Sequence, residues 1–383
     1  MTLAVRDTQA PDPLLLAASL ALIGIGAIMA GSSSIGVADE LVGEPLYYFV
    51  QHLAALAIGF VGMLVAYKTP IEWWNRLGSL LFVGAFFLLI AVLVPGIGDR
   101  VNGARRWVDF GPIAFQASEL ARMMLLIYVA SYCVRQREAL CSGFVGFLRP
   151  IVLVGLASVL LLLEPDLGAT VVLVATSLGI LFLAGARLKD LAIAAAAAGV
   201  ALAALIWSSA YRLDRLLCWR DPWEDALDCG YQLVNSFIAI GSGTWFGVGL
   251  GQGVQKLHYL PEPHTDFVFA VLAEEAGLIG ATVVIVLFSM LVYRAFDVGR
   301  RAIAAGQSFH GLLAIGIGLS LGLQAAISIG VNTGLLPTKG LTLPLISYGR
   351  TSIVVTLFAL GLLLRVAREV DDPPLPERKR SVA

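Results

Sequence analysis

Long apolar runs separated by short polar segments form the pattern of this chain. Four runs are uncharged and close to the length that crosses about 30 Å of hydrocarbon. They cover residues 13–31, 77–95, 168–186 and 191–209. Six further runs with polar interruptions cover residues 47–67, 117–133, 144–163, 267–292, 312–331 and 352–366. The pattern predicts an all-α polytopic membrane protein with ten transmembrane helices, in a single integral membrane domain that spans residues 1–383.

The composition supports this fold class, excludes an ordinary soluble protein and argues against a nucleic-acid partner. A mean hydropathy of +0.85 with only 14% charged residues excludes an ordinary soluble protein. Outside the short run 378–380, the chain has no basic block with interleaved aromatic residues. We therefore expect no nucleic-acid partner.

The Lys and Arg residues predict the orientation in the membrane. With the N-terminus inside, 16 of them fall in cytoplasmic segments and nine in outer ones, so we expect both termini to be cytoplasmic. The first apolar run lacks a basic leader and a convincing cleavage site, so it is expected to remain as a span. Residues 367–383 are expected to form a disordered cytoplasmic tail.

The longest outer connection, residues 210–266, lies between the seventh and eighth predicted helices. It contains an amphipathic run, 231–240, followed by G-S-G-T-W-F-G-V-G-L-G-Q-G at 241–253. These glycines do not have the spacing of a dinucleotide fingerprint, and they are explained either by close backbone packing or by a flexible turn. A structureless loop of this length would be unusual unless it were functional.

Three carboxylates, Asp266, Glu274 and Glu275, stand in the apolar stretch 260–277. Ionisable groups at membrane depth are costly unless they are paired or wetted, so their default interpretation is a functional site that faces a cavity. Glu274 and Glu275 are about 100° apart around a helix. They therefore need not point into the same cavity.

The cysteines divide between the two sides of the predicted membrane. Cys133 and Cys141 fall near the cytoplasmic face, whereas Cys218 and Cys229 share the long outer loop, where an oxidising compartment permits a disulfide. A Cys218–Cys229 bridge is our hypothesis. The histidines are too scattered to suggest a metal set. They are His52, His258, His264 and His310.

Two further pairs of charged residues leave alternatives open. Glu119 and Arg122 are three residues apart, so they share a helix face and form either a structural ion pair, which we favour, or a direct substrate contact. Glu164 and Asp166 flank Pro165, which ends one span and predicts a re-entrant or interfacial corner. For that corner the structural and functional interpretations stay equally open.

Five motifs occur in order along the chain and together resemble the SEDS family of bacterial cell-wall polymerases, which serve shape, elongation, division and sporulation. The motifs are N-G-A-R-R-W at 102–107, Q-A-S-E-L-A-R at 116–122, E-P-D-L-G-A-T at 164–170, V-Q-K-L-H-Y-L-P-E-P-H-T-D-F at 254–267 and N-T-G-L-L-P-T-K-G-L-T-L-P-L-I-S-Y-G at 332–349. The last resembles the division members more than the elongation members. The chain departs from the family at Ala117, where proline is frequent, and at Arg350 and Thr351, where glycine and serine are usual.

The resemblance implies a glycosyltransferase that polymerises lipid II on the outer face of the bacterial cytoplasmic membrane, at the division septum. It also implies a class B penicillin-binding transpeptidase and other division proteins as partners. Asp266 matches the aspartate that is essential in the family.

The chemistry of such a reaction needs a base for the acceptor hydroxyl and cations for the departing pyrophosphate. Asp266 suits the base; its alternative role is to hold a divalent cation, Mg²⁺ or Mn²⁺. Arg106 and Lys339 are the foremost candidates for the pyrophosphate, although any single one of these cations could instead snorkel to the lipid headgroups. The other candidate substrate-binding residues are Arg105, Lys256, His264, Glu164, Asp166 and Ser347, and Arg350 offers an additional phosphate contact.

Two other functions fit the same hydrophobic pattern. A transporter (flippase) for lipid-linked precursors would also need many helices with intramembrane charges, but we find no convincing inverted repeat. A non-catalytic scaffold that recruits a transpeptidase would not need Asp266. Polymer formation that depends on Asp266 therefore discriminates the enzyme from both.

Overall fold

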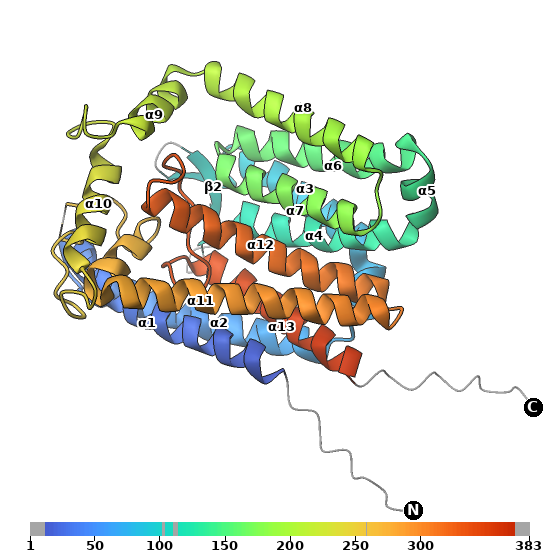
Figure 1. Cartoon of the computed structure of the whole chain (residues 1–383), viewed down its shortest axis with the longest axis horizontal. Coiled ribbons are helices and arrows are strands. Elements are labelled where there is room, and N and C mark those ends of the chain that lie inside the picture. The colour runs from blue at the N-terminus through green and yellow to red at the C-terminus, as the bar shows by residue number, and fades with distance from the viewer. Residues whose placement is uncertain (1–11, 102–103, 110–113, 258, 372–383) are drawn as a thin grey trace, which may run out of the picture.

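The computed structural model describes residues 12–101, 104–109, 114–257 and 259–371. Figure 1 shows long helices lying side by side in one bundle. The helices are α1 (Pro13–Val42), α2 (Tyr47–Lys68), α3 (Ile71–Leu93), α4 (Ala117–Arg135), α5 (Arg137–Ser142), α6 (Phe144–Leu163), α7 (Leu167–Leu183), α8 (Leu188–Trp207), α9 (Ala210–Arg220), α10 (Tyr231–Gly243), α11 (Val268–Ala304), α12 (Ser308–Asn332) and α13 (Arg350–Asp371).

Each of the ten predicted apolar runs overlaps one of these helices. Within the described residues, eight helices are long and apolar enough to cross a membrane, namely α1, α2, α3, α4, α6, α8, α11 and α12. Helix α7 is apolar but has only 17 residues, and α13 carries charged side chains in its last turns. The chain is therefore a multi-pass membrane protein, while the count of ten spans stays a prediction.

A small antiparallel sheet corrects the all-α prediction. Its strands are β1 (Gly98–Val101), β2 (Ala104–Asp109) and β3 (Ala114–Gln116), in the order β1-β2-β3. The side chain of Val108 in β2 packs with Val92 and Ala117, at the ends of α3 and α4. The sheet thus covers the place where these two helices meet, and it presents Arg106 from its central strand.

Small residues set the closest approaches between helices. A Cβ added at Gly59 of α2 would lie 2.5 Å from Leu357 of α13, and one added at Gly361 would lie 2.3 Å from the Met63 carbonyl oxygen. Only glycine lets the two backbones come this near, as is typical of helix pairs in membranes. The pair α11 and α12 makes a similar close contact at Gly299.

Both described chain ends lie at one end of the bundle. Asp12, which caps α1, pairs with Arg294 and lies 3.7 Å from Arg301, and Arg301 also contacts Asp371 at 2.5 Å. The sheet, α9 and α10 lie at the opposite end (Figure 1). This arrangement fits termini on one side of a membrane, but which side remains a prediction.

The predicted tail begins later than expected. Residues 367–371 continue α13, because Val366 and Ala367 are still buried in the bundle. Residues 372–383 of the predicted tail lie outside the described residues. The predicted outer connection, 210–266, holds helices α9 and α10.

Candidate functional site

Three successive backbone carbonyls before α11 are fixed by the last residue of α12 and by the segment that follows this helix. The hydrogen bonds run from Tyr348 N to His264 O (2.8 Å), from Ser347 Oγ to Thr265 O (2.5 Å) and from Asn332 Nδ2 to Asp266 O (2.9 Å). Because all three accept bonds, the backbone that carries Asp266 is tightly held. Ser347, a predicted substrate-binding residue, is buried and acts on this backbone.

The Asp266 side chain is half-buried and faces a glycine. A Cβ added at Gly340 would lie 2.9 Å from its Oδ2 atom, so the loop 333–349 passes directly over the carboxylate. In the described part of the chain, this carboxylate makes no hydrogen bond or ion pair. Burial raises the pKa of Asp266 to about 7; the charge of Glu262 adds to the rise, and Arg106 and Arg215 oppose it.

Arg106 is held at the corner between α6 and α7. Its Nε donates to Glu164 O at 2.8 Å, and a terminal nitrogen donates to the Pro165 carbonyl. These bonds fix a guanidinium whose charge reaches both Asp266 and Glu164. The structure therefore brings Arg106 and the corner toward Asp266.

The two acids of that corner behave differently. Asp166 caps α7 by accepting from Ala169 N at 3.0 Å, and its other oxygen accepts from Ser118 Oγ at 3.0 Å and from Gln116 Nε2. Glu164 is fully buried, and neither carboxyl oxygen has a hydrogen-bond partner among the described residues. Burial, with a smaller contribution from Asp166, raises the pKa of Glu164 to about 8. Glu164 is therefore mostly neutral at pH 7, whereas Asp166 is a helix cap.

Lys256 lies in a buried ion pair. Its Nζ atom is 2.5 Å from Glu275 and donates to Ser32 Oγ at 2.7 Å, and both charged side chains are less than 10% exposed. Glu274 accepts from the backbone N–H groups of Val254 and Gln255. The ammonium of Lys256, a predicted substrate-binding group, is thus occupied within the protein.

The glycine-rich segment packs closely against α11. Gly277 has φ 67° and interrupts the helix, so the preceding carbonyls are free to accept from Val248 N (3.0 Å) and Gly249 N (3.1 Å). A Cβ added at Gly247 would lie 2.0 Å from the Glu275 carbonyl oxygen. Of the two interpretations of these glycines, close backbone packing is confirmed at Gly243 and Gly247, whereas a Cβ added at Gly241 or Gly251 would meet no described atom within 4 Å.

Glu119 and Arg122 form the expected ion pair, at 2.5 Å. Arg122 also donates to Gln324 Oε1 at 3.1 Å, and Gln324 Nε2 donates to Thr342 O at 3.1 Å. A chain of hydrogen bonds therefore leads from the buried pair to the loop over Asp266. Sequence reasoning missed Gln324 and Asn332, although both are polar residues in or beside an apolar run, which is itself a functional signal.

Lys339 and Arg105, two predicted phosphate ligands, lie in different surroundings. Lys339 is half-buried in the loop 333–349. Burial lowers the pKa of Lys339, and the charges of Arg215 and Arg212 lower it further. Arg105 Nη1 donates to Leu93 O at 3.3 Å, at the end of α3. Arg212 and Arg215, both in α9, were not selected as site residues from the sequence.

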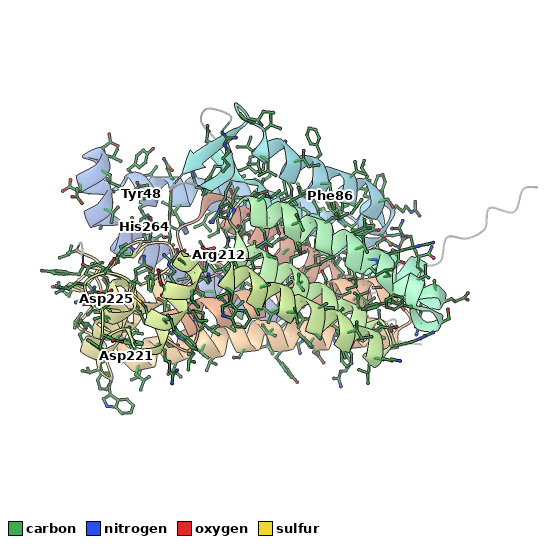
Figure 2. All side chains as sticks on the ribbon, turned by 90° about the horizontal axis from the view of Figure 1, so that it is seen from above. Tyr48, Phe86, Arg212, Asp221, Asp225 and His264 are labelled. Carbon is green, nitrogen blue, oxygen red and sulfur yellow. A yellow bond between two sulfur atoms is a disulfide. The ribbon has the colours of Figure 1, made fainter. Side chains whose placement is uncertain are left out.

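His264 lies in an aromatic cluster. Its ring stacks on that of Tyr48, which is labelled beside it in Figure 2, with centroids 5.2 Å apart. The ring of Tyr348 lies at 5.6 Å. Burial lowers the pKa of His264, which favours the neutral ring. Across the described ranges, no three His, Cys, Asp or Glu side chains gather as a metal set. His258 lies outside the described residues.

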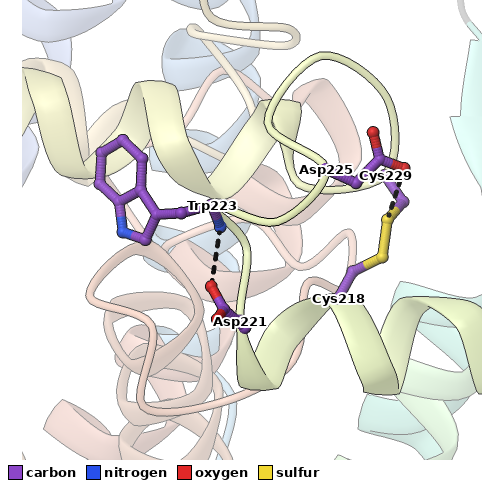
Figure 3. The surroundings of a disulfide bond; sticks show 5 residues. All are labelled: Cys218, Asp221, Trp223, Asp225 and Cys229. Atoms are coloured by element: carbon purple, nitrogen blue, oxygen red, sulfur yellow. Dashed lines mark hydrogen bonds between the residues drawn. A yellow bond between two sulfur atoms is a disulfide. The ribbon is translucent and has the colours of Figure 1, made fainter.

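The outer loop is braced by the predicted disulfide. Cys218 in α9 is bonded to Cys229, with Cα atoms 6.1 Å apart (Figure 3). Within the closed loop, the Asp221 carboxylate accepts from Trp223 N at 3.2 Å. The hypothesis of a Cys218–Cys229 bridge is confirmed.

A mostly apolar groove with a volume of about 370 Å³ opens between α2 and α13. It is lined by Gln51, Ala54, Ala55, Ile58, Phe115, Leu120, Arg350, Thr351, Val354 and Val355. Tyr348 OH donates to Gln51 Oε1 at 2.9 Å, and Tyr348 N binds the His264 carbonyl. One residue thus joins the groove to the Asp266 backbone.

Comparisons with known proteins agree along nearly the whole chain. A family model named for FtsW, RodA and SpoVE and described as "Cell cycle protein" matches residues 13–372. A "Probable peptidoglycan glycosyltransferase FtsW" of Thioalkalivibrio sulfidiphilus is 50% identical, covering 97% of this chain and 94% of the relative. The protein of the same name from Nitrosococcus halophilus is 49% identical, with coverages of 97% and 96%.

Two solved structures share the fold. One, described as "Structural coordination of polymerization and crosslinking by a peptidoglycan synthase complex", matches with a TM-score of 0.77 and 27% identity, covering 95% of this chain and 100% of that one. Thermus thermophilus rod shape determining protein RodA matches with a TM-score of 0.70 and 28% identity, with coverages of 94% and 97%.

Proposed function

Because this chain belongs to the FtsW, RodA and SpoVE family, we propose that it is a peptidoglycan glycosyltransferase that polymerises lipid II during cell division. The names of its relatives support the reaction. The observation that carries the proposal is Asp266: a carboxyl whose backbone is fixed at three successive carbonyls while its own oxygens are left unpaired among the described residues.

Asp266 acts as the general base in this proposal. A sugar hydroxyl of the acceptor gives its proton to the carboxylate as its oxygen bonds to the anomeric carbon of the donor. The bond from that carbon to the pyrophosphate breaks, and the electron pair leaves with the pyrophosphate. A pKa of about 7 favours this role, because a base works best when its pKa lies near the operating pH.

A divalent cation is the alternative role for Asp266. Since the described residues offer no three-ligand set, Mg²⁺ or Mn²⁺ would be shared between this carboxylate and the substrate pyrophosphate, as is usual for Mg²⁺. The cation would then neutralise charge on the leaving group. Metal titration of the purified protein separates the two roles.

The groove between α2 and α13 suits the polyprenyl chain of the substrate. It is mostly apolar, and Arg350 stands at its edge, at the start of α13. A cation at a helix N-terminus favours a phosphate there. We place the lipid in this groove, its pyrophosphate toward Arg350, Arg106 and Lys339, and its sugars over Asp266.

The comparisons support our proposals for the partner and the location. The similar solved structure belongs to a complex that couples polymerization to crosslinking. We infer a class B penicillin-binding transpeptidase as partner, other division proteins beside it, and a place at the septum with Asp266 on the outer face. Fluorescent fusions and cysteine labelling from outside the cell would test these assignments.

The test of the function is polymerisation of lipid II by the purified chain, with and without the transpeptidase and divalent cation. We expect glycan strands from the wild type and none from Asp266→Asn. Glu224→Gln, which changes an exposed carboxylate in the loop after α9, is the matched control. Strands that form equally well with Asp266→Asn would refute the proposal and leave a scaffold or a flippase.

A further inference from the structure

One face of α9 carries two arginines and a tryptophan. Arg212, Arg215 and Trp219 are spaced at i, i+3 and i+7, so their side chains lie along the same side of the helix. Arg212 and Arg215 are half-buried, whereas Asp214 and Arg220 are exposed. The arginine pair is therefore covered by the protein to a greater extent than Asp214 and Arg220 are.

Trp219 shows what this face meets. Its indole Nε1 donates to the Gly334 carbonyl at 2.8 Å, in the loop 333–349 that also contains Lys339. Phe237 of α10 lies against the same glycine, because a Cβ added at Gly334 would be 2.4 Å from its ring. Helices α9 and α10 thus converge on the loop that covers Asp266.

Two covalent and polar contacts hold α9 in this position. The disulfide to Cys229 leaves α9 at Cys218, the residue before Trp219 (Figure 3). At the other end of the helix, Arg212 Nη1 donates to Leu205 O at 2.8 Å, in the last turn of α8. The guanidinium keeps further donors for a ligand, because arginine has five.

The arrangement gathers like charges beside the candidate base. Arg212 and Arg215 act on Lys339, and the charge of Arg215 also reaches Asp266. In the described part of the chain, neither Arg212 nor Lys339 has an ion-pair partner. Clustered cations repel one another, and an anionic ligand would remove that cost.

We propose that Arg212, Arg215 and Lys339 form one anion-binding subsite for the diphosphate of a polyprenyl-linked sugar. The inference rests on the proposed function and deepens it, because Lys339 alone of the three was a candidate before. Arginine engages phosphate oxygens with two parallel hydrogen bonds, so the subsite both orients the diphosphate and stabilises the charge that it gains as it leaves. The disulfide and Trp219 are its supports.

The test compares Arg215→Gln with Arg220→Gln, which removes an exposed arginine from the same helix. The assay measures KM for lipid II and the inhibition constant of undecaprenyl pyrophosphate, both in zwitterionic nanodiscs. We expect Arg215→Gln to raise both by about tenfold or more, as loss of a charge-assisted contact predicts, and Arg220→Gln to leave both within about twofold. Arg215→Lys, which keeps the charge, should recover part of the loss.

The other outcomes count against either the subsite or the polymerase proposal. If Arg215→Gln and Arg212→Lys both bind undecaprenyl pyrophosphate as the wild type does, the inference is wrong while the polymerase proposal stands. If anionic phospholipid added to the nanodiscs inhibits the wild type as strongly as undecaprenyl pyrophosphate and loses its effect in Arg215→Gln, the site is a general headgroup site. A wild type that forms no glycan under any condition would instead refute the polymerase proposal. The subsite would still be tested by comparing the binding of undecaprenyl pyrophosphate to the wild type and to Arg215→Gln.

Discussion

Two acidic sites stand eight residues apart around the start of α11, and they are built in opposite ways. Glu274 and Glu275 are almost fully buried and fully partnered, by two backbone N–H groups and by Lys256 with Ser32. Asp266 is half-buried, and its carboxylate has no hydrogen-bond or ion-pair partner among the described residues, although its backbone is held.

The difference indicates which of the two sites has a structural role and which has a chemical one. A buried carboxylate that accepts strong hydrogen bonds has its charge stabilised, and it serves to fix the glycine-rich segment against α11. A carboxyl that is perturbed mainly by burial, with no hydrogen bond among the described residues, has its pKa raised and its oxygens available. We therefore assign structure to Glu274 and Glu275 and chemistry to Asp266.

The largest expected effect is that of Asp266→Asn on the rate. Because the amide cannot accept the proton, we expect polymerisation to fall by about 10²-fold to 10⁴-fold, the usual contribution of a general base. Single-turnover polymerisation with saturating lipid II measures this. A drop in lipid II affinity with an unchanged rate would instead favour the cation-binding role.

The same substitution should also stabilise the fold at neutral pH. The pKa of Asp266 rises from 3.8 to about 7 on folding, so between those values the folded protein holds a proton that the unfolded chain releases. Stability therefore falls as the pH rises through that window, and Asp266→Asn removes the fall. Thermal melting at pH 5 and pH 8 in detergent should show a larger gain at pH 8.

Breaking the second site should reverse the pattern. Lys256→Met leaves Glu275 charged and buried without its cation, which costs about 3–5 kcal/mol of stability. We expect a lower melting temperature and a near-normal rate per folded molecule. Lys256→Met combined with Glu275→Leu should recover part of the stability, and a rate that stays lost in a well-folded double variant would place Lys256 in the reaction.

The pH dependence of the wild-type polymerisation rate tests the same contrast, with an expected effect of intermediate size. Since the active base is the ionised form, the rate should rise about tenfold per pH unit below pH 7 and level off above it. A rate that is flat between pH 5 and pH 8 would contradict the assignment of Asp266 as the base.

Local features could be predicted from the sequence, whereas contacts between segments far apart in the chain could not. The apolar runs, the Cys218–Cys229 bridge and the Glu119–Arg122 pair depend on spacing alone. The partner of Lys256 depends on the kink at Gly277, and the strands are too short to give a clear alternating pattern, although the Asn-Gly pair between β1 and β2 is a hairpin signal. In the sequence, Arg212 and Arg215 are indistinguishable from ordinary loop charges. Only the contact of Trp219 with the loop 333–349 shows which way their side of α9 faces.

Gln324 connects the buried ion pair to the active loop, and its removal should have a smaller effect. Gln324→Leu breaks the bonds to Arg122 and to Thr342 O, so we expect the rate to fall by about tenfold, the cost of one or two hydrogen bonds to a charged group. Lipid II affinity should change less than the rate. Gln324→Glu, which keeps an acceptor for Arg122, should restore part of the rate if the link to the ion pair positions the loop.

The smallest effect tests whether burial without a partner is enough to make an acid reactive. Glu164 is more deeply buried than Asp266, and its carboxyl also has no hydrogen-bond partner among the described residues. Its pKa of about 8 keeps it protonated at pH 7. The neutral isostere Glu164→Gln should therefore keep the rate within about twofold at pH 7. Between pH 4.5 and about 8 the folded protein holds a Glu164 proton that the unfolded chain releases, so wild-type stability falls across this window and levels off above it, whereas the variant should show no such fall. A large loss of rate in Glu164→Gln at pH 7 would mean that the carboxyl proton itself is used, and the contrast between paired and unpaired acids would then extend to two reactive groups.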